Sequence, residues 1–100
     1  MSKTNLKPGV VTGEGYTTLV EAAKSGGYAL PAVNVIGTNS INAVMEAAAK
    51  AQSDIIIQLS NTGGQFYAGR GIEDAFKAKV AGSVAAAQHV HLLAQHYGIC

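Results

Sequence analysis

The sequence predicts an α/β fold with a parallel sheet, and two observations lead to that prediction. Short apolar runs rich in β-branched residues alternate along the chain with amphipathic stretches of helical length. Such alternation is typical of parallel strands, because each helix carries the chain back across the sheet. The second strand run is continuously apolar and bounded by turn residues, which indicates a strand buried on both faces.

The first regular element expected is a helix over residues 14–25, after an irregular entry that contains the turn signal Pro8-Gly9. Gly26 and Gly27 should end this helix, because glycine adopts the left-handed conformation that closes many helices. Apolar side chains recur at the helical spacing i, i+3, i+4 and i+7. They are Tyr16, Leu19, Val20 and Ala23.

A strand is expected next, over residues 28–36. Pro31 should lie near its start, because proline has no amide hydrogen to donate to the ladder. Thr38, Asn39 and Ser40 follow as three candidate N-caps of a second helix. That helix has the clearest apolar stripe of the chain, and Gln52 with Ser53 should close it. The stripe consists of Ile41, Val44, Met45, Ala48 and Ala49.

The second strand is expected over residues 54–60, where three consecutive isoleucines precede Ser60. Residues 61–71 are rich in glycine and are predicted to form a loop anchored by Phe66 and Tyr67. A long helix is predicted over residues 74–97, with Gly98 as its C-cap. Its core-facing stripe is expected to be Phe76, Val80, Ser83, Ala87, Val90, Ala94 and Tyr97.

A third strand would begin at residues 98–100, where the chain ends. Two parallel strands cannot make a sheet that is covered on both faces. We therefore expect the chain to be the N-terminal portion of a larger domain, or to need partners that complete its sheet.

Composition narrows the function classes. The chain is 48% hydrophobic and 13% charged with a net charge of +1, and it has no basic patch interleaved with aromatics, so nucleic acid is not an expected partner. No apolar run approaches the roughly 18 residues that span a bilayer, and the lysines near the N-terminus precede no apolar segment of a signal peptide. The single cysteine, Cys100, excludes an internal disulfide and suits a reducing compartment such as the cytoplasm.

Two polar residues end consecutive predicted strands. Asn34 lies late in the first strand and Ser60 ends the second. Ligands bind at the carboxyl ends of parallel strands, so we interpret Ser60 as a contact to a substrate phosphate and Asn34 as a second pocket residue. The alternative is that each side chain only satisfies nearby backbone groups, as serine and asparagine often do.

A glycine pattern after the second strand is close to a P-loop. That motif requires a lysine and then a hydroxyl residue after its last glycine, and here Arg70 and Gly71 follow Gly69. We prefer to interpret this segment as a flexible loop over the end of the second strand. A further option is that the loop closes on the substrate.

Three histidines in the last predicted helix do not form a metal site by spacing. His89 and His91 point about 200° apart on a helix, and His96 is too far from His89 to share an ion within that helix. Cys100 is not interpreted as a nucleophile, because no base can be placed beside it. No metal ligand and no catalytic residue is therefore assigned within the chain.

Five groups of residues, in order along nearly the whole chain, resemble class II fructose-bisphosphate aldolases. They are ALPAVNV at 29–35, TNS with INAV at 38–44, QLSNTGG at 58–64, YAGRG at 67–71, and AQHVH with HYG at 87–91 and 96–98. The segment with the Gly-Arg-Gly sequence looks like the dimeric subgroup of that family.

The resemblance implies that residues 1–100 are the N-terminal fragment of a single TIM-barrel domain, a (β/α)₈ barrel. They would supply the first helix, two strand–helix units and the start of a truncated third strand. It implies a cytoplasmic, homodimeric, zinc-dependent lyase of glycolysis and gluconeogenesis. That enzyme cleaves fructose 1,6-bisphosphate reversibly into dihydroxyacetone phosphate and glyceraldehyde 3-phosphate.

The same resemblance assigns roles to particular residues. Ser60 matches the family serine that binds the phosphate of the glyceraldehyde 3-phosphate half, and Asn34 matches an asparagine that lines the substrate pocket. The proton donor and the zinc ligands would lie beyond residue 100, so the chain alone is expected to be inactive. Two alternatives are a non-catalytic sugar-phosphate-binding or scaffold module and another class II sugar-phosphate aldolase.

Overall fold

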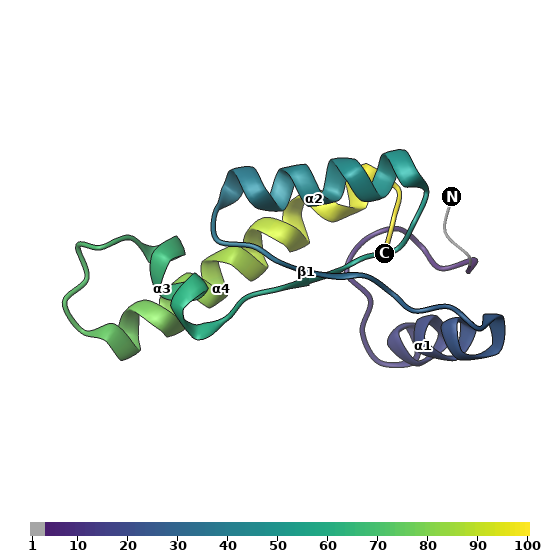
Figure 1. Ribbon diagram of the computed structural model, residues 1–100, viewed down its shortest axis with the longest axis horizontal. Helices are drawn as coiled ribbons and strands as arrows, with labels where there is room; N and C mark the ends of the chain where they lie inside the picture. Colours follow the sequence, from purple (N-terminus) through teal and green to yellow (C-terminus); the bar gives the residue numbers. More distant parts are fainter. Residues whose placement is uncertain (1–3) are drawn as a thin grey trace.

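Helices and short strands alternate along the chain, as Figure 1 shows for the computed structural model, which describes residues 4–100. Met1, Ser2 and Lys3, on which part of the signal-peptide interpretation rests, lie outside the described residues. The elements are α1 (Glu14–Gly26), β1 (Ala32–Asn34), α2 (Thr38–Ala51), β2 (Ile56–Gln58), α3 (Asn61–Ala68), α4 (Ala75–Leu93) and the 3₁₀ turn η1 (Ala94–Tyr97). None of the helices in residues 4–100 combines the length and the hydropathy that crossing a bilayer requires.

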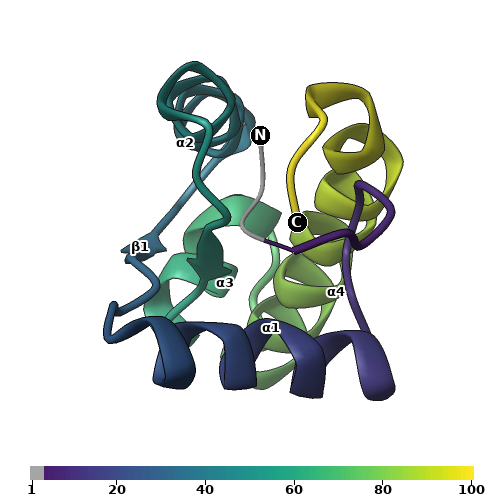
Figure 2. The ribbon, with the colours of Figure 1, turned by 90° about the vertical axis from the view of Figure 1, so that its right-hand side faces the viewer.

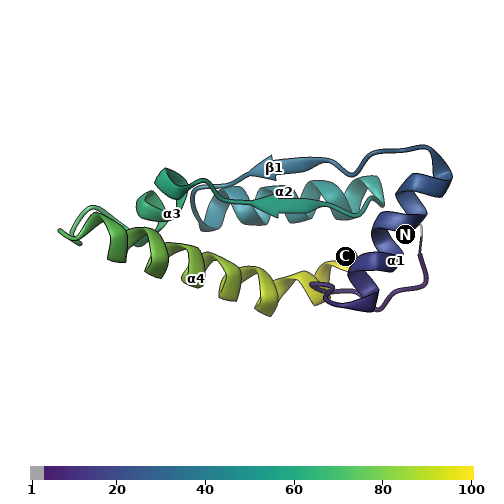
Figure 3. The same cartoon turned by 90° about the horizontal axis from the view of Figure 1, so that it is seen from below.

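The molecule is elongated, with principal extents of 46 × 22 × 19 Å. Helix α3 and the start of α4 lie at one end and α1 lies at the other, with the strands between them (Figures 1 and 3). Seen along the long axis, α2 and α4 lie on either side of the C-terminal segment (Figure 2). A hydrogen bond of 2.9 Å between His89 Nε2 and Asn42 Oδ1 connects these two helices.

The two strands form a parallel pair, which confirms the predicted direction of the sheet. The backbone bonds continue past the strands, since Val35 N donates to Gln58 O at 3.0 Å and Ile56 N donates to Pro31 O at 2.9 Å. Pro31 thus lies directly before β1 and uses only its carbonyl, as predicted. On the side of β2 away from β1, Ile55 N donates to Cys100 O at 3.0 Å, so the residues around Cys100 lie beside β2.

The strands are shorter and more exposed than predicted. Each has three residues, whereas runs of nine and seven were expected. Val33 is 38% exposed and Ile56 is 41% exposed, so the expectation of burial on both faces is wrong for the described chain. The physical reason is that the sheet has only two strands within residues 4–100, and a pair leaves ladder groups and side chains without neighbours.

The predicted C-terminal ends of α1 and α2 are confirmed, whereas the predicted N-cap of α2 is wrong. Gly27 closes α1 in the left-handed region with φ 68°, as expected, and Gln52 closes α2 with φ 54°. The N-cap of α2 is Gly37, not one of the three predicted candidates. Ser40 instead lies in the first turn, and its hydroxyl oxygen accepts from the amides of Ile36 and Gly37, both at 3.1 Å.

Residues 61–68 form helix α3, so the predicted loop over 61–71 is wrong for most of its length. Glycine has a low intrinsic helix propensity, but tertiary packing overrides it here. Gly63 and Gly64 are both buried, and a Cβ atom built on Gly64 would lie 2.5 Å from Ser83 Oγ. Gly64 therefore allows a close contact between α3 and α4 that a larger residue would prevent.

The predicted stripe over residues 74–97 is wrong in its first half and is confirmed at its end, where Ala94 is buried and Val90 and Tyr97 pack against the core. Phe76 is 75% exposed and Val80 is 50% exposed, while Ala78, Gly82 and Ala86 are buried. The prediction relied on alternating spacings of four and three residues along the helix and did not include the contact with α3. The close contact with α3 instead selects the small residues, because backbones approach each other only where side chains are small.

The hydrophobic core lies between α2, the strand ends and the C-terminal half of α4. Val44, Leu59 and Tyr97 are among the partly buried side chains that pack against it. Its buried members come from β1's end, α2, α4 and η1. They are Val35, Ile41, Met45, Ala86 and Ala94.

Candidate functional site

Three polar side chains share one face at the carboxyl ends of the two strands. Asn34 is directly opposite Gln58 in the parallel register. Side chains alternate between the faces of an extended chain, so Ser60 points to the same side as Gln58 two residues earlier. The backbone of Ser60 is still extended, with φ −79° and ψ 167°, so the alternation holds at that position.

Asn34 and Gln58 are joined by a hydrogen bond in which Gln58 Nε2 donates to Asn34 Oδ1. This bond occupies the carbonyl of Asn34 and leaves its amide hydrogens free to donate, while the carbonyl of Gln58 is free to accept. Such a pair suits the hydroxyl and carbonyl oxygens of a sugar. Gln58 was not proposed from the sequence, although its place two residues before Ser60 is a signal that could have found it.

Ser60 is the N-cap of α3. Its Oγ accepts a hydrogen bond from Gly63 N at 3.0 Å and lies 3.3 Å from Thr62 Oγ1. The structure therefore supports the alternative in which Ser60 bonds nearby backbone groups. That role does not use all the hydrogen-bonding capacity of the hydroxyl. A serine hydroxyl has one donor and two acceptor positions, so Ser60 can cap the helix and still donate to a ligand.

Helix α3 begins at this site and adds a second feature suited to an anion. The first amides of a helix have no carbonyl partner within it, and the helix dipole places partial positive charge at the same end. Ser60 and the first turn of α3 thus lie together at the carboxyl end of β2 (Figure 1). An anionic group of a substrate would find a hydroxyl donor and backbone donors there.

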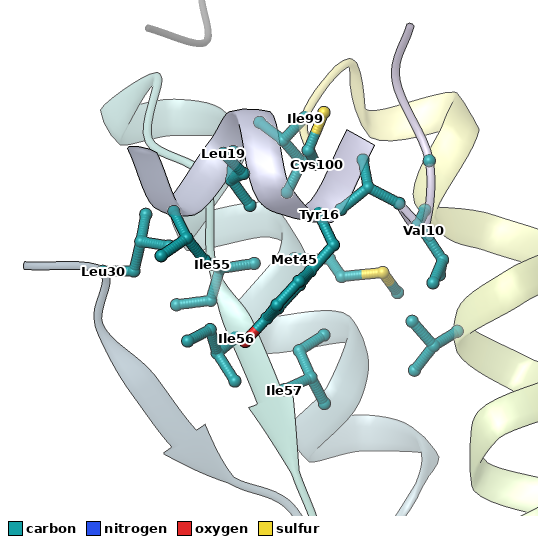
Figure 4. A pocket seen from close by; sticks show the side chains of 15 residues that line it. Val10, Tyr16, Leu19, Leu30, Met45, Ile55, Ile56, Ile57, Ile99 and Cys100 are labelled. Atoms are coloured by element: carbon teal, nitrogen blue, oxygen red, sulfur yellow. The ribbon is translucent and has the colours of Figure 1, made fainter. Parts of the chain in front are cut away.

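The best-defined apolar cavity is in a different part of the molecule. It has a volume of about 240 Å³ and lies between α1, β2 and the C-terminal segment. Tyr16 and Leu19 of α1 point into it toward Ile55 and Ile56 (Figure 4). Its lining is almost wholly apolar and includes neither Asn34 nor Ser60, so it does not have the chemistry of a sugar-phosphate site.

The remaining sequence candidates are separated from Ser60 and Asn34. Within residues 4–100, no group of three or more His, Cys, Asp or Glu side chains is placed to hold a metal ion. His89 bonds Asn42, and His91 and His96 are exposed. The glycine segment that approaches a P-loop pattern forms most of α3 and the turn after it, so it is not the loop that motif requires.

Cys100 lies near the buried carboxylate of Asp54, which is 4% exposed and accepts from Cys100 N at 3.1 Å. Burial raises the pKa of the Cys100 thiol, and the charge of Asp54 raises it further because it repels a thiolate. The fold therefore favours the neutral thiol. This contribution to stability is present below the unfolded-state pKa and is lost as pH rises through the higher folded-state pKa.

The shifted thiol predicts slow alkylation. At about pH 8, just below the ordinary thiol pKa, iodoacetamide should modify Cys100 more slowly in the folded chain than in the chain unfolded in urea. D54N keeps an acceptor for the Cys100 amide but removes the charge, so it should speed the reaction of the folded chain. Equal rates in the folded and unfolded chain across the pH range would contradict the shift.

Comparisons with known proteins show which family the chain belongs to. The family model described as "Fructose-bisphosphate aldolase class-II" matches residues 14–100. Fructose-bisphosphate aldolase class 2 of Escherichia coli is 46% identical over 96 residues, which cover 94% of this chain and 27% of that protein. The fructose-bisphosphate aldolase of Campylobacter jejuni is 49% identical over 94 residues, which cover 94% of this chain and 26% of that protein.

The fold comparison agrees. The crystal structure of fructose-bisphosphate aldolase from Campylobacter jejuni matches with a TM-score of 0.87 and 49% identity, over 94% of this chain and 26% of that chain. The chain thus spans about a quarter of the length of these relatives. The helices and the parallel strand pair form part of a TIM barrel, which confirms the predicted fold class. The chain belongs to the class II fructose-bisphosphate aldolase family.

Proposed function

We propose that this chain supplies part of the substrate pocket of a class II aldolase and forms the N-terminal portion of its single barrel domain. The reaction is the reversible cleavage of fructose 1,6-bisphosphate into dihydroxyacetone phosphate and glyceraldehyde 3-phosphate. The observation that carries the proposal is the parallel register, which aligns Asn34 with Gln58. The alternation of side chains along an extended chain puts Ser60 on the side of Gln58. Family membership over residues 14–100 supports it.

Ser60 has the role of binding the phosphate of the glyceraldehyde 3-phosphate half. Its hydroxyl donates to a phosphate oxygen while it accepts from Gly63 N, and the first turn of α3 adds backbone donors. Asn34 lines the pocket and donates its amide hydrogens to the sugar, since its carbonyl is held by Gln58. These residues bind and orient the substrate and do not perform the carbon–carbon cleavage.

Zinc is the metal of the proposed enzyme, and the residues of this chain do not fit it. Bound zinc would act as a Lewis acid on the substrate carbonyl. No cluster of three ligating side chains occurs in the described residues, so the ligands and the proton donor would come from outside residues 1–100. The proposed enzyme is cytoplasmic and a homodimer, as the family resemblance implies.

The test uses this chain by itself and as part of a hybrid enzyme. The 100-residue chain with added zinc should not cleave fructose 1,6-bisphosphate, because residues 4–100 hold no group of three metal ligands and the family resemblance puts the proton donor beyond residue 100. A hybrid in which this chain replaces the matching quarter of the Campylobacter jejuni aldolase should cleave it, since the two share 49% identity over that part.

Other outcomes would reject the proposal. Cleavage by the isolated chain would overturn the assignment of the catalytic groups to other parts of the enzyme. A folded hybrid that binds sugar phosphates without cleaving them would favour a non-catalytic module. A hybrid that prefers another ketose bisphosphate would favour a different class II sugar-phosphate aldolase.

A further inference from the structure

We propose that Gly63 is a positioning residue, whose lack of a side chain sets where the Ser60 hydroxyl lies and thereby how strongly a phosphate binds. This inference rests on the proposed function of Ser60. A Cβ atom at Gly63 would lie 3.2 Å from Ser60 Oγ, 3.3 Å from Val35 O and 3.6 Å from Ile36 Cγ2. Gly63 thus touches both the phosphate-binding hydroxyl and the end of β1.

The other side of α3 is held equally closely by α4. A Cβ atom at Gly82 would overlap Gly64 O, and one at Gly64 would lie 3.0 Å from Lys79 O. Helix α3 therefore lies between the end of β1 and the backbone of α4, with no room to move toward either. An added methyl group at Gly63 must therefore displace a neighbouring atom, because helix α3 itself cannot shift.

The group that yields is the side chain of Ser60. Of the three atoms near a Cβ at Gly63, Val35 O belongs to the backbone beside the sheet, whereas Ser60 Oγ turns about a single bond. A shift of a few tenths of an ångström would relieve the contact with Ser60 Oγ, whereas the contact with Val35 O remains. The same shift would lengthen the 3.0 Å bond from Gly63 N and turn the hydroxyl away from its ligand.

The effects of G63A on stability and on phosphate binding distinguish a positioning role of Gly63 from a merely structural one. Alanine is a better helix former than glycine, and Gly63 lies in α3 without a positive φ. This gain offsets the weaker cap bond and the tight contact with Val35 O, so G63A should leave the melting temperature of the chain nearly unchanged. Phosphate binding should nevertheless weaken. A merely structural role would make stability and binding fall together.

The experiment titrates the full 100-residue chain with inorganic phosphate and follows backbone amides by NMR. G63A should raise the phosphate Kd by about threefold to tenfold, the range expected when one hydrogen bond to a charged group is impaired. In the S60A background, G63A should have no further effect, because the hydroxyl that it displaces is gone. G71A is the matched control, since nothing lies within 4 Å of its added methyl group, and it should leave the Kd unchanged.

The outcomes separate this inference from the proposed function. If S60A weakens phosphate binding and G63A does not, the positioning role is overturned and the role of Ser60 stands. If S60A has no effect, the proposed role of Ser60 fails. The hydrogen-exchange rate of the residue-63 amide tests the movement of the Ser60 hydroxyl directly, because this amide donates to it. An unchanged rate in G63A would mean that the hydroxyl has not moved and would overturn the inference.

Discussion

Replacing Gly82 by alanine should lower the free energy of unfolding by about 3 kcal/mol, within the range of overpacked interiors. The added Cβ would overlap Gly64 O and lie 2.7 Å from Gly64 C, and these backbone atoms cannot rotate away as a side chain could. Helix α3 must therefore separate from α4. Urea unfolding followed by circular dichroism measures the change.

The control for G82A is a substitution at another helical glycine, Gly15, where an added methyl group has room. A Cβ at Gly15 of α1 would meet Val11 Cβ at 3.4 Å, an ordinary contact, so G15A should stabilise the chain by about 0.5–1 kcal/mol. If G82A were as stable as G15A, the close contact between α3 and α4 would be wrong. That result would also remove the constraint on which the positioning role of Gly63 depends.

Replacing Ser60 by alanine should raise the KM of the hybrid enzyme for fructose 1,6-bisphosphate by about tenfold or more, with a smaller change in kcat. The physical reason is the loss of a hydrogen bond to a charged phosphate, which typically contributes about 1.5–3 kcal/mol. Steady-state kinetics at several substrate concentrations separates KM from kcat.

Ser60 also caps α3, so the loss of a cap needs its own control. Asp74 caps α4 in the same way, accepting from Lys77 N at 3.1 Å, and has no proposed role in the substrate pocket. D74A should cost about 1 kcal/mol of stability, as S60A should through its cap, but leave KM unchanged. If D74A and S60A raised KM equally, the effect would come from helix capping and the phosphate role would be rejected.

Only part of the candidate site could be predicted from the sequence. Asn34 and Ser60 could be selected because each is a polar residue that ends an apolar strand run, and parallel strands end at one edge. Gln58 was missed because its role depends on the register, which brings it opposite Asn34. Register is a property of pairing between strands that lie 24 residues apart in the chain.

The sequence by itself determined the alternation of helices and strands, the parallel direction of the strands and the apolar stripe of α2. These follow from local periodicity and from glycine and proline positions, which act within a few residues. Only the tertiary structure decided that residues 61–68 are helical and that α4 buries Ala78, Gly82 and Ala86 in place of Phe76 and Val80. The reason is that Gly64 and Gly82 form one contact between two helices, and the advantage of a small residue there appears only when its partner is present.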